Sequence, residues 1–192
     1  MTLRFFRPLL AALALVSTLR AQEPPPTVIE CAGPSETVAT DTETIATFRD
    51  KVVVTGNNIR VTCDFLKVVA SRKGDPKATI GKFGYFKSLV ATGHVTITQG
   101  DREATCGQAE IFPGEERVVL SRLSKSDPFP SVRSTDDQYT ATGPRMILYR
   151  GERRAVIEPE DGVGGQITLP PIKDLGFSKE KPAEIPAPPK QP

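Results

Sequence analysis

The sequence contains little of what a metal site needs. It has one histidine, His94, and three cysteines, Cys31, Cys63 and Cys106, and no two cysteines are separated by only two residues. His94 stands twelve residues from the nearest cysteine, whereas zinc sites are commonly built from closely spaced Cys and His ligands. We therefore expect no bound metal and no cofactor.

Motifs for catalysis are also scarce. The segment from Gly74 to Phe83 superficially resembles a phosphate-binding loop, but its glycine spacing is wrong and Phe83 stands where Ser or Thr would hold magnesium. Carboxylates such as Asp136 and Asp137 lie in polar, turn-like stretches, where solvated charge is their ordinary role. His94 directly follows a glycine and indicates a turn or strand start rather than a general base. The sequence predicts that the protein is not an enzyme.

One long apolar run is present, and it lies at the N-terminus. Arg4 and Arg7 precede Leu9–Val16, and a small residue, Ala21, ends the segment. The run is shorter than the roughly 20 residues of a spanning helix. This pattern predicts a signal peptide over residues 1–21, cleaved before Gln22, and export to the periplasm. An uncleaved membrane anchor is the alternative, and in either case the protein leaves the cytosol.

The charge balance excludes one class of partner. Residues 1–21 carry Arg4, Arg7 and Arg20 and no acidic residue, so their removal takes the formal charge from +2 to −1. A nucleic-acid-binding protein is expected to carry a clustered basic patch. We therefore expect no nucleic acid partner.

Proline marks both ends of the chain and gives the domain boundaries. Pro24, Pro25 and Pro26 follow the expected cleavage site, and several of the eighteen prolines lie after residue 181. Proline cannot continue a helix or occupy a central strand. We expect residues 22–42 to form an extended segment with the first strand, 43–169 the main domain, and 170–192 a disordered tail.

The central segment has the composition of short strands and turns. It is rich in Val, Ile, Thr and Phe, which suit a pleated surface, and Gly, Asn and Asp interrupt it. After the turn at Gly56-Asn57-Asn58, the segment Ile59–Phe65 alternates apolar with polar residues, which is the period of a strand. No long, well-capped helical period is found, so the sequence predicts an all-β fold.

An internal repeat refines this prediction. The segment from Val52 aligns without a gap on the segment from Val95, which places Cys63 on Cys106 at a constant offset of 43. A degenerate third copy places residues 137–143 on residues 101–107, at an offset of 36. Units this small must stack to bury a face. The repeat predicts a β-solenoid or an elongated jelly roll, and equivalent positions allow a disulfide between Cys63 and Cys106.

An ordered series of motifs, which begins at Val52 and recurs from Val90 to Ile111, resembles the LptA/OstA-like family of lipopolysaccharide transport proteins. Val52-Val53-Val54, a polar turn and a strand ending Asp64-Phe65-Leu66 resemble the family's "G-N-V-x-V" and "A-D-x-L" pattern, and the order recurs from Val90 to Ile111. Val118–Leu120 followed by Pro130 resembles its "L-x-L-x-G-x-P" strand. Asp50-Lys51 stands where Gly-Asn is common. The resemblance covers Glu43 to Glu158.

The resemblance implies a fold, a function and partners. The fold is a twisted antiparallel β-jelly roll, solenoid-like with open ends. The function is a periplasmic bridge or carrier in lipopolysaccharide transport to the outer membrane, with acyl chains in the apolar interior. The partners are lipopolysaccharide or a related lipid, LptC-like and LptD-like envelope proteins, and further copies stacked head to tail through strand edges. A structural β-solenoid scaffold that binds no ligand is the alternative.

We expect a set of apolar residues to point inward, where the resemblance implies lipid contact. Any β-sandwich core also requires inward aliphatic side chains, so the same residues fit a packed core without a ligand. The set is Val52, Val54, Ile59, Val61, Phe65, Val95, Ile97, Ala104, Ile111, Leu120, Ile147 and Tyr149.

A basic, aromatic segment separates the first two repeat copies. Residues 71–87 are rich in Lys and Gly and include Phe83, Tyr85 and Phe86. Such a segment suits contact with lipid head-group phosphates or a membrane surface. A solvated loop whose aromatic rings pack over one end of the fold is the other interpretation.

Overall fold

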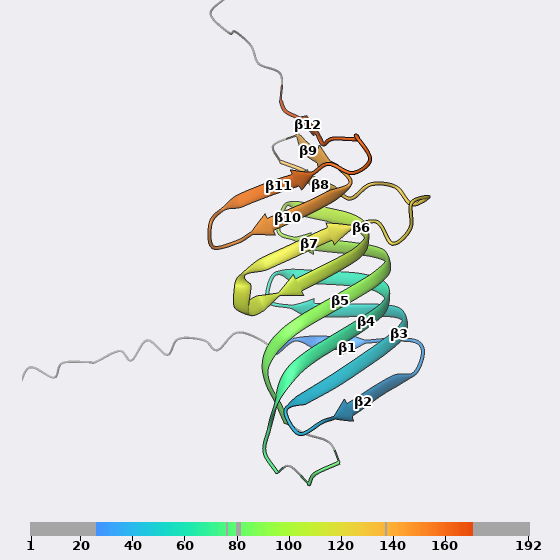
Figure 1. Cartoon of the computed structure of the whole chain (residues 1–192), viewed down its shortest axis with the longest axis vertical. Coiled ribbons are helices and arrows are strands. Elements are labelled where there is room, and N and C mark those ends of the chain that lie inside the picture. The colour runs from blue at the N-terminus through green and yellow to red at the C-terminus, as the bar shows by residue number, and fades with distance from the viewer. Residues whose placement is uncertain (1–25, 76, 80–81, 137, 171–192) are drawn as a thin grey trace, which may run out of the picture.

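The structure is a computed structural model that describes residues 26–75, 77–79, 82–136 and 138–170. The signal peptide expected at residues 1–21 and the tail from residue 171 onward lie outside these residues. The described chain forms one antiparallel sheet of twelve strands (Figure 1), and its one helical element is a 3₁₀ turn, Pro113–Glu115. The all-β prediction is confirmed.

The long strands pair in sequence order, whereas several of the shorter strands pair with non-consecutive neighbours. Two short strands precede residue 43, and four long strands form the centre. In order they are β1 (Val28–Glu30), β2 (Ser35–Ala39), β3 (Glu43–Gly56), β4 (Ile59–Lys73), β5 (Lys82–Gln99), β6 (Arg102–Phe112), β7 (Arg117–Ser121), β8 (Ser131–Ser134), β9 (Tyr139–Thr142), β10 (Arg145–Tyr149), β11 (Arg154–Glu158) and β12 (Gln166–Thr168).

Two tight turns connect the long strands as their residue types dictate. Asn57-Asn58 joins β3 to β4, and Gly100-Asp101 joins β5 to β6. Asn58 and Gly100 have φ angles of 58° and 60°, the left-handed region that Gly and Asn tolerate best. The turn predicted at Gly56-Asn57-Asn58 is confirmed.

The sheet is bent into two halves, and the long strands β3 to β6 pass from one half into the other. Half-sheet A contains β1, residues 52–56, 59–63, 95–99 and 102–106 of the long strands, and β8, β9 and β12. Half-sheet B contains β2, residues 43–49, 65–73, 82–92 and 107–112, and β7, β10 and β11. Figure 1 shows the long strands wrapping around the body in this way.

The bend is made by irregular backbone inside the strands, which we call the corner. On β3 the register shifts between Arg49 and Val52, and on β5 between Thr92 and Val95. Two successive residues at each place have positive φ: 64° and 51° at Asp50 and Lys51, and 77° and 46° at Gly93 and His94. The motif position with the unusual Asp50-Lys51 is therefore a β-bulge.

The corner keeps the apolar side chains on the inside of both half-sheets. On β3, three residues separate the inward residues Phe48 and Val52, and on β4 two residues separate Cys63 from Leu66. The same spacings recur on β5 and β6 at an offset of 43. A regular strand would not give the two-residue spacing, because in it every second residue points to the same face. The predicted repeat is thus a repeated corner.

The third repeat copy requires a correction of one residue. Ala104 and Ala141 share an inward row through Val132, and Ala109 and Met146 share one through Leu120. Both pairs have an offset of 37, whereas the sequence alignment used 36. A slip of one residue in a strand exchanges its two faces, so the aligned copy would have pointed the wrong side chains inward.

The ends of the body carry unpaired strand edges. At the N-terminal end β1 and β2 each pair only with β3, and at the other end β11 pairs only with β10 and β12 only with β9. Apolar side chains on these strands are exposed, among them Val28, Val38 and Ile167. The described sheet is therefore open at both ends.

Replacing the corner glycine on β5 tests the corner. We expect Gly93→Ala to lower the free energy of unfolding by about 1–3 kcal/mol, because an L-residue in the left-handed region costs about 1–2 kcal/mol and the new Cβ would collide with the Asp64 carboxylate. Urea unfolding measures the change. Gly114→Ala is the matched control, since a Cβ there meets nothing within 4 Å. Equal effects of the two substitutions would contradict this account.

Candidate functional site

The candidate site is the apolar space between the inner faces of the two half-sheets. On half-sheet A, cross-strand pairing aligns one inward residue from each of eight strands, a set we call row A. Its members are Ile29, Val54, Val61, Ile97, Ala104, Val132, Ala141 and Ile167. Every member is apolar, and the row runs from edge strand to edge strand.

Half-sheet B presents a matching row, which we call row B, on the opposite side of the space. Its members are Phe48, Leu66, Ala91, Ala109, Leu120, Met146 and Ile157. Members of rows A and B belong to one hydrophobic cluster, together with the corner residues Val52, Cys63, Val95 and Cys106. The two inner faces therefore pack against each other beside the corner.

The burial of this space falls with distance from the corner on β5 to β11. It does not fall on β3 and β4, where Thr44 and Ala70, far from the corner, are 0% exposed. Leu66, Ala109, Leu120 and Met146 of row B are at most 2% exposed. The next row on half-sheet B, which we call the margin row, is half-buried over much of its length. Its members are Ala46, Val68, Leu89, Ile111, Val118, Leu148 and Ala155, of which Leu89, Ile111, Val118 and Leu148 are partly accessible. The interior is closed at the corner and more accessible toward the margin.

Nine of the twelve expected inward residues lie on these inner faces. Val52, Val54, Val61, Val95, Ala104 and Leu120 belong to the buried cluster, and Ile59 and Ile97 pack against it. Ile111 is half-buried between Leu89 and Val118, its cross-strand partners in the margin row. Their placement is geometric, and contact with a lipid stays a prediction.

The other three expected residues point outward. Phe65 follows Asp64 in the two-residue corner segment of β4, where Leu66 takes the inward position, and the Arg49 guanidinium lies 5.1 Å from the Phe65 ring centroid. On β10 the inward residues are Met146 and Leu148. Ile147 and Tyr149 therefore lie on the opposite face. Ile147 is nevertheless buried there, at 6% exposed, and Arg154 packs 4.2 Å from the Tyr149 ring centroid.

Several interior residues were missed by the sequence reasoning. Leu66, Val68, Ala91, Ala109 and Met146 are all buried in the cluster. The 43-residue offset could have revealed part of this set. After each cysteine, two residues and not one precede the next inward position, and the offset then places Leu66 on Ala109. A strictly alternating interpretation of β4 leads to Phe65 instead.

The interior has the chemistry of a hydrocarbon surface. Its two buried thiols belong to Cys63 and Cys106, and the half-buried Cys31 packs against the same cluster. Burial raises the pKa of Cys63 to about 11, with a smaller contribution from the charge of Asp64, and burial raises the pKa of Cys106 to about 12. Both thiols are therefore protonated at neutral pH and are poor nucleophiles.

The structure does not form the disulfide considered from the repeat. All three cysteines are free thiols. Cys63 lies on β4 and Cys106 on β6, with β5 between them. Two strand spacings amount to about 9.5 Å, whereas Cα atoms of a disulfide are usually about 4.4–6.8 Å apart.

The single histidine lies outside the interior, at the corner. His94 Nδ1 lies 2.6 Å from Asp64 Oδ2, and the two side chains are largely exposed. The hydrogen bond from His94 to Asp64, together with the charge of Asp64, raises the pKa of His94 above its usual value of 6.5. The pair joins β4 to β5 where both strands bend.

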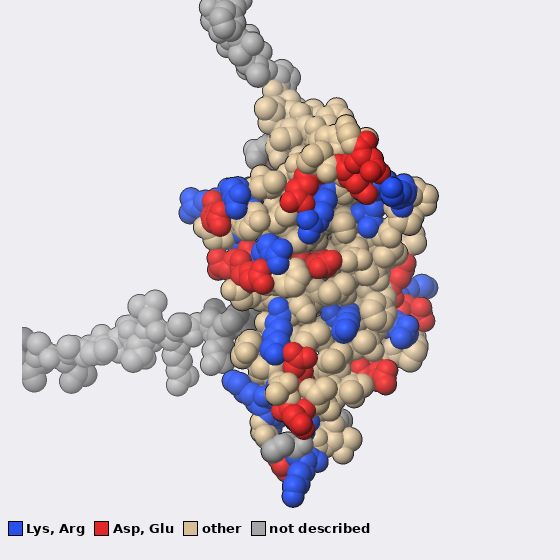
Figure 2. Space-filling model, in the orientation of Figure 1, with Lys and Arg blue, Asp and Glu red and all other residues tan. Residues whose placement is uncertain are grey.

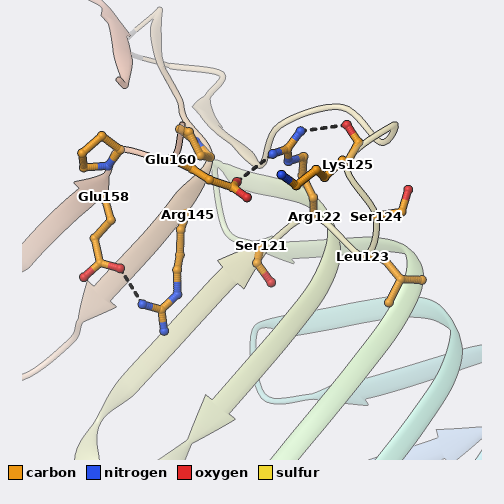
Figure 3. Close-up of a pocket in the computed structure, with 10 residues that line it drawn as sticks. Ser121, Arg122, Leu123, Ser124, Lys125, Arg145, Glu158 and Glu160 are labelled. Atoms are coloured by element: carbon orange, nitrogen blue, oxygen red, sulfur yellow. Dashed lines mark hydrogen bonds and ion pairs between the residues drawn. The ribbon is translucent and has the colours of Figure 1, made fainter. Parts of the chain in front are cut away.

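Two hollows lie beside this framework. The first, of about 340 Å³, is lined by residues including Arg122, Lys125, Arg145, Glu158 and Glu160. Figure 3 shows that its arginines are paired: Arg122 contacts Glu160 at 2.7 Å and donates to the Lys125 carbonyl, and Arg145 contacts Glu158. These ion pairs compensate the arginine charges.

The second hollow, of about 390 Å³, lies at the C-terminal end of half-sheet A. Its lining includes Val132 and Tyr139, which pack against the core cluster, together with Arg102, Arg133 and Leu169. The hollow therefore adjoins the inner face at the open end of the sheet, where an apolar surface and cationic side chains lie together.

Within the residues that the structure describes, no group of three or more His, Cys, Asp or Glu side chains is placed to share a metal ion. No described helix has the length and apolar character required to cross a bilayer.

Comparison with solved structures identifies the fold. The chain is similar to LptH of Pseudomonas aeruginosa, described as the LptA-homologous periplasmic component of the lipopolysaccharide transport device. The similarity covers 76% of this chain and 96% of that chain, with a TM-score of 0.55 and 14% sequence identity. No family model matches the sequence, and no curated protein sequence matches it. The fold is thus an LptA-like twisted β-jelly roll, as the sequence motifs indicated.

The His94–Asp64 pair predicts a measurable titration. We expect His94 to titrate above its usual pKa of 6.5, and Asp64→Asn to lower the pKa by removing the charge and the acceptor. The pair should stabilise the fold fully below about pH 6.5 and lose this effect as the pH rises through the raised pKa. NMR can follow the imidazole directly, since the chain has one histidine. An unchanged titration in the variant would count against the pair.

Burial of the thiols predicts selective alkylation. At pH 8 in the folded protein, iodoacetamide should modify the partly accessible Cys31 and leave Cys63 and Cys106 unmodified, because both are buried with pKa values of about 11 and 12. Denaturant should make all three react, as counted by mass spectrometry. Rapid native modification of Cys63, or a Cys63–Cys106 disulfide in the oxidised protein, would contradict the structure.

Proposed function

We propose that the protein is a periplasmic lipid-binding bridge or carrier in lipopolysaccharide transport, and that it holds acyl chains against its inner faces. The observation that carries this proposal is row A, an unbroken apolar track across eight strands. At about 4.8 Å per strand spacing the track is roughly 34 Å long. A continuous apolar surface of this kind can contact a hydrocarbon chain along its whole length, because no polar residue interrupts the row.

The fold comparison supports the same function. LptH, which shares the fold, is described as a periplasmic component of the lipopolysaccharide transport device. The N-terminal pattern of residues 1–21 agrees with a periplasmic location, because it has the features of a signal peptide.

Entry of a lipid from the margin suits the burial pattern. The interior is tightly packed beside the corner, whereas Leu89, Ile111, Val118 and Leu148 of the margin row are partly accessible. Acyl chains would first contact the margin and then separate the half-sheets, which are covalently joined through the corner strands. The polar head group would stay in water outside the sheet.

Partners would dock through the strand edges. The edges of β1 and β2 at one end, and of β11 and β12 at the other, leave backbone groups available for strand addition. LptC-like and LptD-like proteins, or further copies stacked head to tail, would extend the apolar track from one domain to the next. The exposed apolar residues Val28 and Ile167 lie on these edge strands.

A structural scaffold is the second candidate, and the dense interior favours it. Val52, Leu66, Ala109 and Leu120 are at most 2% exposed, which is the packing of a completed protein core. A scaffold would use the same strand edges for assembly and would never open the space between the half-sheets.

Photo-crosslinking in the periplasm separates the two functions. We expect a photoreactive residue replacing Val61 or Ile97, both in row A, to give lipopolysaccharide-sized adducts. Arg60, exposed on β4 beside Val61, is the control. A second matched pair is Leu148, inward on β10, and its neighbour Tyr149, outward. Adducts at the inward positions alone support the carrier, whereas protein adducts only, or none at any position, favour the scaffold.

A further inference from the structure

The β4–β5 hairpin extends beyond the strands on either side of it. The pairing of β3 with β4 ends at Ser71, and the pairing of β6 with β5 begins at Leu89. Beyond these points β4 and β5 pair only with each other, as in Arg72↔Phe83 and Lys73↔Lys82. Figure 1 shows the hairpin projecting at the lower end of the body, past β2. We call the described residues from Ser71 to Lys87 the hairpin tip.

Three aromatic side chains of the hairpin tip are exposed. Phe83 is 45% exposed, Tyr85 67% and Phe86 42%. They are exposed because no strand covers this part of the hairpin on either side. The β4–β5 register is irregular around Ala70, and Ser71 Oγ accepts a hydrogen bond from Tyr85 N. Gly84 allows this close approach, since a Cβ there would lie 2.8 Å from the Ser71 carbonyl oxygen. The expectation that these rings pack over one end of the fold is not met.

The same segment carries a local positive charge. Residues 71–87 contain five Lys or Arg residues and one acidic residue, Asp75. The whole chain has a formal charge of +2, so the rest of the chain is negative overall. Lys87 pairs with Glu43 at 2.7 Å, and Lys73, Lys77 and Lys82 are exposed. Figure 2 shows Lys and Arg side chains at this lower end.

We propose that the hairpin tip binds the surface of a lipid bilayer that contains anionic lipid. Aromatic rings prefer the membrane–water interface, and lysine side chains place their stems along apolar surface while the ammonium group reaches phosphates. Anionic lipids attract basic segments by about 1 kcal/mol for each Lys or Arg near the surface. The tip supplies both components within one projecting hairpin.

The charge pattern favours a bilayer as the occupant. The exposed lysines lie on both strands and in the connecting segment, so positive charge is spread along the whole tip, which suits an extended anionic surface more than a single anionic group. The tip lies outside rows A and B, so this proposal does not depend on lipid carriage. It gives the protein a membrane contact in addition to the protein contacts proposed at its strand edges.

A single tryptophan can report on the contact, because the chain contains none. In the full chain, we expect Tyr85→Trp to show a blue-shifted emission on addition of phosphatidylcholine vesicles containing phosphatidylglycerol, and quenching by brominated acyl chains. Pure phosphatidylcholine vesicles should give a much smaller response. Leu123→Trp is the matched control, since Leu123 is 54% exposed near Arg122 and Lys125 but lies outside the hairpin; it should not respond.

Charge removal tests the electrostatic component. In the Tyr85→Trp background, Lys73→Gln, Lys77→Gln and Lys82→Gln together should weaken vesicle binding on the order of 100-fold, or about fivefold for each lysine. Added salt should weaken the parent chain more than the triple variant. Thermal unfolding should be unchanged, because the three lysines are exposed, and this confirms that the variant is folded.

Three results would overturn the proposal. The first is an unchanged tryptophan emission of the Tyr85→Trp chain with anionic vesicles. The second is an equal response of the Tyr85→Trp and Leu123→Trp chains, which would indicate unspecific adsorption. The third is a response to lipopolysaccharide micelles without a response to anionic vesicles, which would assign the tip to a transported lipid and not to a bilayer.

Discussion

Each long strand of this protein has to turn from one half-sheet into the other without carrying its apolar side chains to the outside. The backbone meets this constraint with a fixed count of residues: three between inward positions on β3 and β5, and two on β4 and β6. Left-handed residues at Asp50-Lys51 and Gly93-His94 provide the bend. Because neighbouring strands turn at the same level, their inward residues stay aligned, and rows A and B follow from this alignment.

The same constraint determines what the interior can do. Side chains that face inward on both half-sheets must fit against one another, so most of them are aliphatic, aromatic, small or thiol groups. Thr44 is a buried polar exception on β3, and the charged residues lie at the corner and on the outer faces. Ion pairs such as Arg122–Glu160 and cation–π contacts such as Arg154–Tyr149 lie outside. The interior thus offers apolar surface and shape. Its chemistry suits binding or packing, and its buried thiols remain protonated.

The sequence predicted the parts of this arrangement that depend on local pattern. Alternation from Ile59 to Cys63 placed Val61 inward, and the 43-residue offset related the two copies of the corner. The errors arose where alternation breaks. Phe65 was expected inward because nothing in its own segment marks the bulge, and Leu66 holds that position. Ile147 and Tyr149 were expected inward because β10 is apolar on both faces, so its residues do not reveal which face meets the core. Cross-strand partners decide the question, and sequence alone does not supply them.

The dense packing of the interior is compatible with the proposed carriage for a physical reason. Separating two apolar faces exposes surface to water at about 25 cal/mol for each Å², so an unloaded carrier of this fold is stable only when its half-sheets are closed. An acyl chain that enters from the margin row replaces side-chain contacts with lipid contacts, and most of that cost is recovered. The corner, with its irregular backbone and register shifts on β3, β4 and β5, would be the hinge of such an opening at the margin, since fewer ladder hydrogen bonds have to change there. Under the proposed carrier function, a dense interior and a lipid-binding interior would be two states of the same residues, and lipid would select between them.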